Sequence, residues 1–365
     1  MANPTPHPTW VRDLKPYVPG KPVEELEREM GIQGAIKLAS NENPLGPSPK
    51  AMDAIRGLAS QSHLYPDAGS YYLKEKLSER LGVQHSQIMI GNGSNELLTL
   101  IVRAFSTTES HAVISEGAFI AYTIVLNAAG VPTTRVPMSP QWTHDLEAMA
   151  AACTDNTRLL FVANPNNPTG TYNSKEAVRK LLKDVPEQVL VVLDEAYFEY
   201  VWADDYPDGM TLLRERENLA VLRTFSKSYG LAGIRVGYGV GPDYVADLVQ
   251  RVREPFSVNL LGQTAAMAAL DDEQFIKDSV RMNREEMLKL VPQLNELGFS
   301  TYETQGNFLL VHAPMGGLKL YDGLLRQGVI VRPLMPYGLT DHVRISIGLP
   351  EENERLVEAL RGVSS

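Results

Sequence analysis

One lysine in this sequence has neighbours that suit covalent chemistry. Lys227 follows Thr224, Phe225 and Ser226 in the run TFSKSYGLAGIRVG, which also contains Arg235. A lysine amine can form a Schiff base with a carbonyl, while hydroxyls and a guanidinium can bind a phosphate. The segment therefore indicates a site for an aldehyde cofactor with a phosphate tail. A solvated lysine in a loop after a strand is the alternative interpretation.

Two other predicted strands also end in polar residues. RLLFVA runs into NPNNPTG, which contains Asn167, and VLVVL runs into Asp194 and then Tyr197. Burying a carboxylate there is costly without a cationic or hydrogen-bonding partner, and a protonated ring nitrogen would be such a partner. Asn167 and Tyr197 can hydrogen-bond a ring hydroxyl. A structural ion pair for Asp194 and an ordinary Asn-Pro turn are the alternatives.

The segment GNGSNELLTL, residues 91–100, places glycines before a predicted helix. Free N–H groups and the dipole at a helix start attract phosphate, by about 0.3–1 kcal/mol per charge at exposed positions. The segment lacks the Gly-Lys-Ser/Thr of a Walker loop and the third glycine of a dinucleotide fingerprint. Taken alone, a turn followed by a helix N-cap explains it better than a phosphate site does.

These polar residues require a sheet to position them, and short apolar runs alternate with helical patterns as far as about residue 250. This rhythm predicts an α/β fold with a mostly parallel, doubly wound sheet. Ligands of such sheets bind outside the carboxyl ends of the strands, so we expect the three polar strand ends to meet in one pocket. The predicted strands are 87–90, 112–115, 158–163, 189–193 and 220–224, and the helices between them are 96–105, 119–129 and 174–183.

The two ends of the chain differ from this central part. Prolines up to about Pro22 predict an extended N-terminal arm, because proline blocks helix and sheet interiors. A short helix at 23–30 ends the arm. We expect the large domain to span 31–250 and a smaller C-terminal α+β domain to span 251–365. In the latter we predict a long helix at 275–298, a helix at 318–327, and strands at 307–313, 329–333 and 342–348.

Composition excludes several classes of protein. The 365 residues carry a formal net charge of −10, which disfavours a nucleic-acid surface. Cys153 is the only cysteine, so no internal disulfide can form and a reducing cytoplasm is expected. We find no secretory signal and no apolar run of the roughly 18 residues needed to span a membrane. The scattered histidines predict no metal site.

The sequence resembles the fold-type I aminotransferases that use pyridoxal 5′-phosphate and, within them, the histidinol-phosphate aminotransferases. The resemblance covers nearly the whole chain. It is carried by KLASNENPLGPSP, LYPDAGSYYLKEKL, GNGSNE, NPNNPTG, VLDEAY, TFSKSYGLAGIRVGY and HVRISIG. The lysine segment, NPNNPTG and DEAY are specific for the cofactor class, whereas PYVPGKP and KLASNENPLGPSP point to the subfamily less strongly.

The resemblance implies catalytic roles for three residues. Lys227 would form the Schiff base with the cofactor and later shuttle the proton. Asp194 would pair with the pyridinium nitrogen and keep the ring an electron sink. Tyr197, together with Asn167, would hydrogen-bond the ring oxygen and lower the basicity of the imine. Phe119 would stack on the ring, at a position where many relatives have tyrosine.

It also implies which residues bind the anions. The cofactor phosphate would be held by Gly93, Ser94, Asn95, Thr224, Ser226 and Arg235, and by Tyr65 from the neighbouring subunit of a homodimer. Arg344 would bind the substrate carboxylate, Arg332 would bind a second anion, and Tyr17 in the arm would close over the substrate. Ordinary surface charges for the two arginines, and an anchoring role for Tyr17, are the alternatives.

The resemblance implies transamination between histidinol phosphate and 2-oxoglutarate, which yields imidazole-acetol phosphate and glutamate in histidine biosynthesis. An aromatic amino acid aminotransferase acting on phenylalanine or tyrosine is the closest alternative, and a phosphothreonine decarboxylase is a third. A cofactor-binding transcription regulator is disfavoured by the negative charge and the short segment before the fold. A nicotinamide dehydrogenase is disfavoured because no G-x-G-x-x-G opens the first helix.

Overall fold

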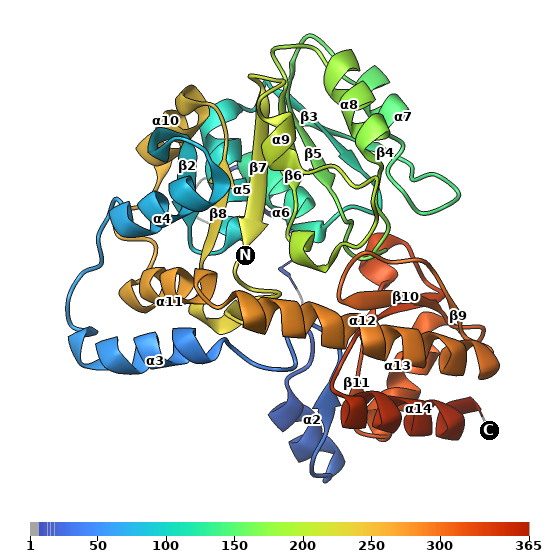
Figure 1. Ribbon diagram of the computed structural model, residues 1–365. Coiled ribbons are helices and arrows are strands. Elements are labelled where there is room, and N and C mark those ends of the chain that lie inside the picture. Colours follow the sequence, from blue (N-terminus) through green and yellow to red (C-terminus); the bar gives the residue numbers. More distant parts are fainter. Residues whose placement is uncertain (1–6, 13, 15, 18, 365) are drawn as a thin grey trace.

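A seven-stranded sheet forms the centre of the larger part of the molecule (Figure 1). The computed structural model describes residues 7–12, 14, 16–17 and 19–364. The strands lie in the order β2-β8-β7-β6-β5-β3-β4, and β8 runs antiparallel to both neighbours while the other six strands share one direction. Their bounds are β2 Ile88–Gly91, β3 His111–Ser115, β4 Thr133–Val136, β5 Thr157–Ala163, β6 Leu190–Asp194, β7 Leu219–Thr224 and β8 Gly237–Val240.

Helices cover both faces of this sheet, which explains why each central strand contains an unbroken apolar run, such as 159–163 in β5, 190–193 in β6 and 219–222 in β7. In β6, Val191 and Leu193 enter one core while Leu190 and Val192 enter the other. Successive strand residues point to opposite faces, so both faces must be buried. One face is covered by α5 Ser94–Phe105, α6 Ile120–Ala129 and α10 Asp243–Val252. The other is covered by α4 Tyr71–Leu81, α7 Leu146–Ala151, α8 Lys175–Asp184 and α11 Leu260–Leu270.

A smaller α+β unit packs beside this large unit. Its four-stranded antiparallel sheet has the order β12-β13-β10-β9, with bounds β9 Ser300–Thr301, β10 Phe308–His312, β12 Arg332–Pro333 and β13 His342–Ser346. The helices are α12 Glu273–Glu296, α13 Gly317–Arg326 and α14 Pro350–Ser364. Figure 1 shows α12 running from α11 toward this sheet. No helix in the described part of the chain is long and apolar enough to cross a membrane.

Most elements match the predictions, and the differences have physical reasons. The predicted helix at 23–30 is α2, Val23–Met30. Strands β4 and β8 were not predicted, because β4 is partly exposed and β8 contains two glycines, which weaken strand propensity. The fully extended arm is wrong at α1, Thr9–Arg12. The seven residues that follow Pro8 contain no proline, and the Pro8 carbonyl accepts hydrogen bonds from the amides of Val11 and Arg12.

Two segments pack across the predicted domain boundaries, so the exact division stays a prediction. Strand β1, Ile36–Lys37, lies in the predicted large domain but pairs with β11, Val329–Ile330, in the small one. Conversely, α11 lies after residue 250 but packs on α3, Pro49–Leu58, in the core of the large unit. The loop between β1 and α3 therefore runs from the smaller unit to the larger one.

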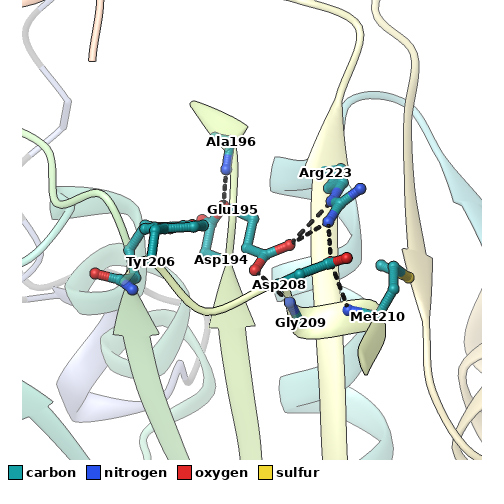
Figure 2. A network of polar contacts seen from close by, with 9 residues as sticks. Asp194, Glu195, Ala196, Tyr206, Asp208, Gly209, Met210 and Arg223 are labelled. Atoms are coloured by element: carbon teal, nitrogen blue, oxygen red, sulfur yellow. Dashed lines mark hydrogen bonds and ion pairs between the residues drawn. The ribbon is translucent and has the colours of Figure 1, made fainter. Parts of the chain in front are cut away.

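A buried ion pair joins the carboxyl ends of β6 and β7. Glu195 Oε2 accepts from Arg223 Nε at 2.9 Å and Nη2 at 2.8 Å, and Glu195 Oε1 accepts from the Gly209 amide at 2.8 Å (Figure 2). Arg223 also donates to Asp208 at 2.9 Å and lies 3.4 Å from the centre of the Phe198 ring. Burial raises the pKa of Glu195 to about 7, although Arg223 acts against this shift. The pair thus anchors the end of the strand that carries Asp194.

Replacing Arg223 by alanine should destabilise the fold strongly, because Glu195 is fully buried and would lose its cation. We expect the free energy of unfolding to fall by about 3–5 kcal/mol, measured by urea denaturation. Arg251→Ala is the matched control, since its pair with Asp247 is exposed on both sides and should contribute little. Equal stabilities of the two variants would show that the buried pair does not anchor the strand ends.

Candidate active site

A cavity of about 260 Å³ lies at the carboxyl ends of the central strands, against the smaller unit. The three polar strand ends meet there, as predicted. The predicted site residues that line this cavity are Tyr17, Ser94, Asn95, Phe119, Asn167, Asp194, Tyr197, Thr224, Ser226, Lys227, Arg235, Arg332 and Arg344. Segments separated by more than 300 residues in the sequence therefore share one site.

Lys227 extends its amine into this cavity from the turn after β7. Its Nζ donates to the carbonyl oxygens of Ser40 at 3.3 Å and Asn41 at 3.2 Å. Burial and the positive charge of Arg344 lower the pKa of Lys227 to about 8. An ordinary lysine has a pKa near 10.5, so this amine loses its proton far more readily and is a better nucleophile at neutral pH.

Asp194 is the last residue of β6 and lines the same cavity. The side chain is only 4% exposed. Both carboxylate oxygens are held: Oδ2 accepts from the Tyr122 hydroxyl at 3.0 Å, and Oδ1 accepts from the Ala196 amide at 3.2 Å. Burial raises the pKa of Asp194 to about 6, while the hydrogen bond from Tyr122 opposes the rise. The group is therefore an oriented acid that a cationic ring nitrogen would stabilise in its charged form.

Tyr197 and Asn167 occupy the part of the cavity next to Arg344. The Tyr197 hydroxyl oxygen accepts from Asn41 Nδ2 at 2.9 Å, and burial raises the pKa of Tyr197 to about 12. Arg344 donates through Nη1 to Asn167 Oδ1 and through Nη2 to the Ala39 carbonyl at 2.6 Å. These hydrogen bonds fix the positions of the two side chains that could contact a ring oxygen.

Arg344 itself is buried, and its Nε is a buried donor with no partner among the described residues. Burial lowers the pKa of this guanidinium. A buried cation with an unpaired donor costs free energy, which an anionic ligand would reduce. The surface-charge alternative for Arg344 is therefore wrong.

A cradle of glycines, hydroxyls and one arginine forms the end of the cavity at the start of α5. Ser94 is the first residue of this helix and Gly93 is its N-cap, with φ +79°. Arg235 Nη1 contacts Ser226 Oγ at 3.4 Å, and a Cβ at position 93 would lie 2.4 Å from Arg235 Nη2. Arg235 has φ +61°, a region that residues other than glycine rarely occupy. The residue types and this close packing suit a phosphate.

At the opposite end, the N-terminal arm meets the smaller unit. Arg332 is half-buried, with its Nη2 3.5 Å from the Tyr17 hydroxyl and its guanidinium carbon 5.6 Å from the centre of the Tyr17 ring. Arg332 and Arg344 thus face the same cavity, Arg344 from deep within it and Arg332 near the arm.

Phe119 precedes α6 and presents its ring to the cavity, in edge contact with Tyr122, with ring centroids 5.8 Å apart.

Two predicted residues do not line the cavity. Gly93 lies just behind it, where it packs against Arg235. Tyr65 is 82% exposed and stacks on Phe256 with ring centroids 4.7 Å apart, so it does not reach the pocket of its own chain. Its predicted role requires a second subunit. No group of three or more metal-ligating side chains occurs among the described residues.

Three further residues were missed at this site: Tyr122, Asn41 and Tyr337. Tyr122 holds Asp194 and follows Phe119 by three residues, a helical spacing that could have suggested it. Asn41 belongs to the KLASNENPLGPSP segment, but the family resemblance implied no role for it. Tyr337 lines the cavity from the smaller unit. Only the folding of distant segments brings the last two to the site.

Comparisons with known proteins agree with this geometry. The family model "Aminotransferase class I and II" matches residues 33–360. Histidinol-phosphate aminotransferase 2 of Pseudomonas fluorescens is 50% identical over 355 residues, 97% of this chain and 96% of that protein. Its namesake from Pseudomonas aeruginosa is 50% identical over 352 residues, with coverage of 96% and 95%.

A solved structure is similar over the entire chain. The histidinol-phosphate aminotransferase of Sinorhizobium meliloti, in complex with pyridoxal-5′-phosphate, has a TM-score of 0.91 and 30% identity, and the match covers 100% of this chain and 99% of that one. The predicted fold class and family are thereby confirmed. This chain belongs to the class I and II aminotransferase family.

Proposed function

We propose that this protein is a pyridoxal-phosphate-dependent aminotransferase that converts histidinol phosphate and 2-oxoglutarate to imidazole-acetol phosphate and glutamate in histidine biosynthesis. The observation that carries the proposal is the buried amine of Lys227 in the same cavity as the buried carboxylate of Asp194. Family membership and relatives at 50% identity support the reaction and the substrate.

The residues of the cavity fit this cofactor. When bound, pyridoxal phosphate supplies an electron sink for the electrons released at the substrate carbon. Lys227 would hold the carbonyl carbon of the cofactor, and Asp194 would pair with the ring nitrogen. Tyr197 and Asn167 would donate to the ring oxygen, and Phe119 would cover one face of the ring. The cradle of Ser94, Asn95, Thr224, Ser226 and Arg235, backed by Gly93, would hold the phosphate.

Lys227 would also move the proton during turnover. Its amine lines the cavity and would carry a proton to and from the reacting carbon of a bound substrate. A positioned base typically contributes about 10²–10⁴-fold to the rate. The lowered pKa of Lys227, about 8, suits this role, because a base works best when its pKa lies near the working pH.

The two arginines give the cavity its preference for anions in a protein that is acidic overall. We assign Arg344 to the carboxylate of glutamate or 2-oxoglutarate, because it is buried and oriented by Asn167. We assign Arg332 to the phosphate of histidinol phosphate, because it lines the cavity beside Tyr17 of the arm. Tyr17 would close over the bound substrate. Guanidinium groups serve both anions through paired hydrogen bonds.

We also propose a cytoplasmic homodimer in which each subunit lends Tyr65 to the phosphate site of its partner. Support comes from the exposure of this tyrosine and from its surroundings. Leu64, Tyr72 and Phe256 are also exposed hydrophobic residues in the nearby loops and helices. The single cysteine is compatible with a reducing compartment.

An aromatic amino acid aminotransferase is the second candidate. The rings of Tyr17, Phe119 and Tyr337 line the cavity and would accommodate phenylalanine or tyrosine as well as an imidazole. The phosphothreonine decarboxylase alternative has no comparable support, because the relatives reported above are transferases of the amino group.

Lys227→Ala should abolish cofactor attachment. The purified wild type should absorb visible light, and borohydride should fix the cofactor on the peptide that contains residue 227. The variant should lose both signals and nearly all turnover, because Lys227 is the one lysine that lines the cavity among the described residues. Lys277→Ala, an exposed lysine, is the control and should match the wild type. A labelled peptide elsewhere in the chain would refute the assignment of Lys227.

Arg332→Ala should separate the two candidate substrates. We expect the wild type to prefer histidinol phosphate over phenylalanine in side-by-side assays of kcat/KM. The variant should lose about 10- to 100-fold with histidinol phosphate, because a charge-assisted contact to phosphate is removed. The value with phenylalanine should change little. A wild type that prefers phenylalanine would instead establish the aromatic aminotransferase.

Gly93→Ala should weaken phosphate binding, because the added Cβ would meet the Arg235 guanidinium and the backbone has a left-handed φ. We expect the dissociation constant for pyridoxal phosphate to rise at least about tenfold, the effect of losing one charge-assisted contact. The constant for pyridoxal, which lacks the phosphate, should change much less. Gly233→Ala is the control, since its Cβ would meet nothing within 4 Å. Equal weakening for both ligands would argue against a phosphate cradle.

A further inference from the structure

Asn41 is a buried residue at the junction of the two units. It is 1% exposed and follows β1, with φ +55°, a region that asparagine tolerates better than most residues. Its side chain contacts Ser346 of β13 in the smaller unit and Tyr197 after β6 in the larger one. The backbone carbonyl of Asn41 accepts from Lys227 Nζ at 3.2 Å and from Asn307 Nδ2 at 3.1 Å.

Ser346 fixes the orientation of the Asn41 amide. The Ser346 hydroxyl donates to Asn41 Oδ1 at 2.9 Å and accepts from the backbone N–H of Asn41 at 2.8 Å. This reciprocal pair places the carbonyl oxygen of the side chain toward β13. The amide nitrogen must therefore point the other way, toward the hydroxyl of Tyr197 at 2.9 Å.

The orientation of Asn41 decides what Tyr197 can do. Because the Tyr197 oxygen already accepts a hydrogen bond, its own proton is left to donate elsewhere. Within the described part of the chain that proton has no protein acceptor, and Tyr197 lines the cavity. Accepting a hydrogen bond also strengthens a hydroxyl as a donor. The Tyr197 hydroxyl is thus prepared to donate to a ligand.

We propose that Asn41 is a positioning residue for the reaction: it holds the Tyr197 hydroxyl as a donor aimed at the ring oxygen of the bound cofactor. The inference rests on the proposed function, which supplies the cofactor. Through its carbonyl, Asn41 also contacts the amine of Lys227, so one residue of the loop after β1 orients two catalytic groups. Ser346 acts through Asn41 and places the smaller unit in the same chain of contacts.

The test is the pH at which the visible absorption of the holoenzyme changes. A hydrogen bond from Tyr197 stabilises negative charge on the ring oxygen, which favours the less protonated form of the bound cofactor. Losing it should move the transition to higher pH. We expect Asn41→Ala to raise the transition by about 0.5–1 pH unit, the effect of one hydrogen bond, and Tyr197→Phe to raise it at least as much.

The double variant Asn41→Ala/Tyr197→Phe distinguishes an effect of Asn41 that acts through Tyr197 from a general disturbance of the site. If Asn41 acts through Tyr197, the double variant should titrate like Tyr197→Phe alone, so the two shifts are not additive. The other charged and titratable groups that act on Tyr197 are Arg344, Asp194 and Tyr337, and all remain in every variant. Lys227 also remains, and borohydride labelling reports its attachment to the cofactor.

Two further variants keep the test decisive. Ser346→Ala removes the hydroxyl that orients the amide without changing Asn41, and should raise the transition in the same direction. Asn218→Ala is the matched control: this asparagine is also buried, but it donates to backbone carbonyls before β6, away from the cavity. It should leave the transition unchanged even where stability falls.

The outcomes distinguish this inference from the proposed function. Shifts in Asn41→Ala and Ser346→Ala that vanish in the Tyr197→Phe background support the positioning role. A wild-type spectrum in Asn41→Ala, or a shift that adds fully to that of Tyr197→Phe, overturns it while leaving the proposed function intact. If Asn41→Ala does not fold, an unchanged Ser346→Ala also overturns it. A wild type without any absorption that borohydride discharges overturns both.

Discussion

The site depends on the in-register parallel pairing of β5, β6 and β7. Ala163 pairs with Asp194, and Asp194 pairs with Leu222, so the three strands end at the same edge of the sheet. Polar residues that follow each strand are therefore delivered to one place. Helices bury both faces of this sheet, which leaves its edge as the position where charged groups can meet a ligand.

Burial then sets the chemistry of the charged groups. The same desolvation that raises the pKa of Asp194 lowers that of Lys227, because each is moved toward its uncharged form. The cationic ring nitrogen of a ligand would offset the free-energy cost of burying the Asp194 carboxylate. An aldehyde on the same ligand would react with the Lys227 amine. Asp194 can stay in place because its neighbour Glu195 is paired with Arg223 on the opposite side of the strand.

The smaller unit completes the site instead of merely covering it. Arg344 reaches from β13 to Asn167 in the large unit, and Ser346 on the same strand holds Asn41. Strand register sends both side chains the same way, since residues two apart share a face. A movement of this unit would therefore change the position of Arg344 and the support of Tyr197 together.

By itself, the sequence determined the α/β class, the main strands and helices, and the residues after each strand, because apolar periodicity and turn residues are local signals. The motif around Lys227 was also local, and so was its family resemblance. Only the tertiary structure decided that Asn41 and Tyr122 hold Tyr197 and Asp194, and that Arg344 is buried with an unpaired donor. It also decided that β8 enters the sheet antiparallel. These features arise from contacts between residues far apart in the chain, whose partners no local pattern specifies.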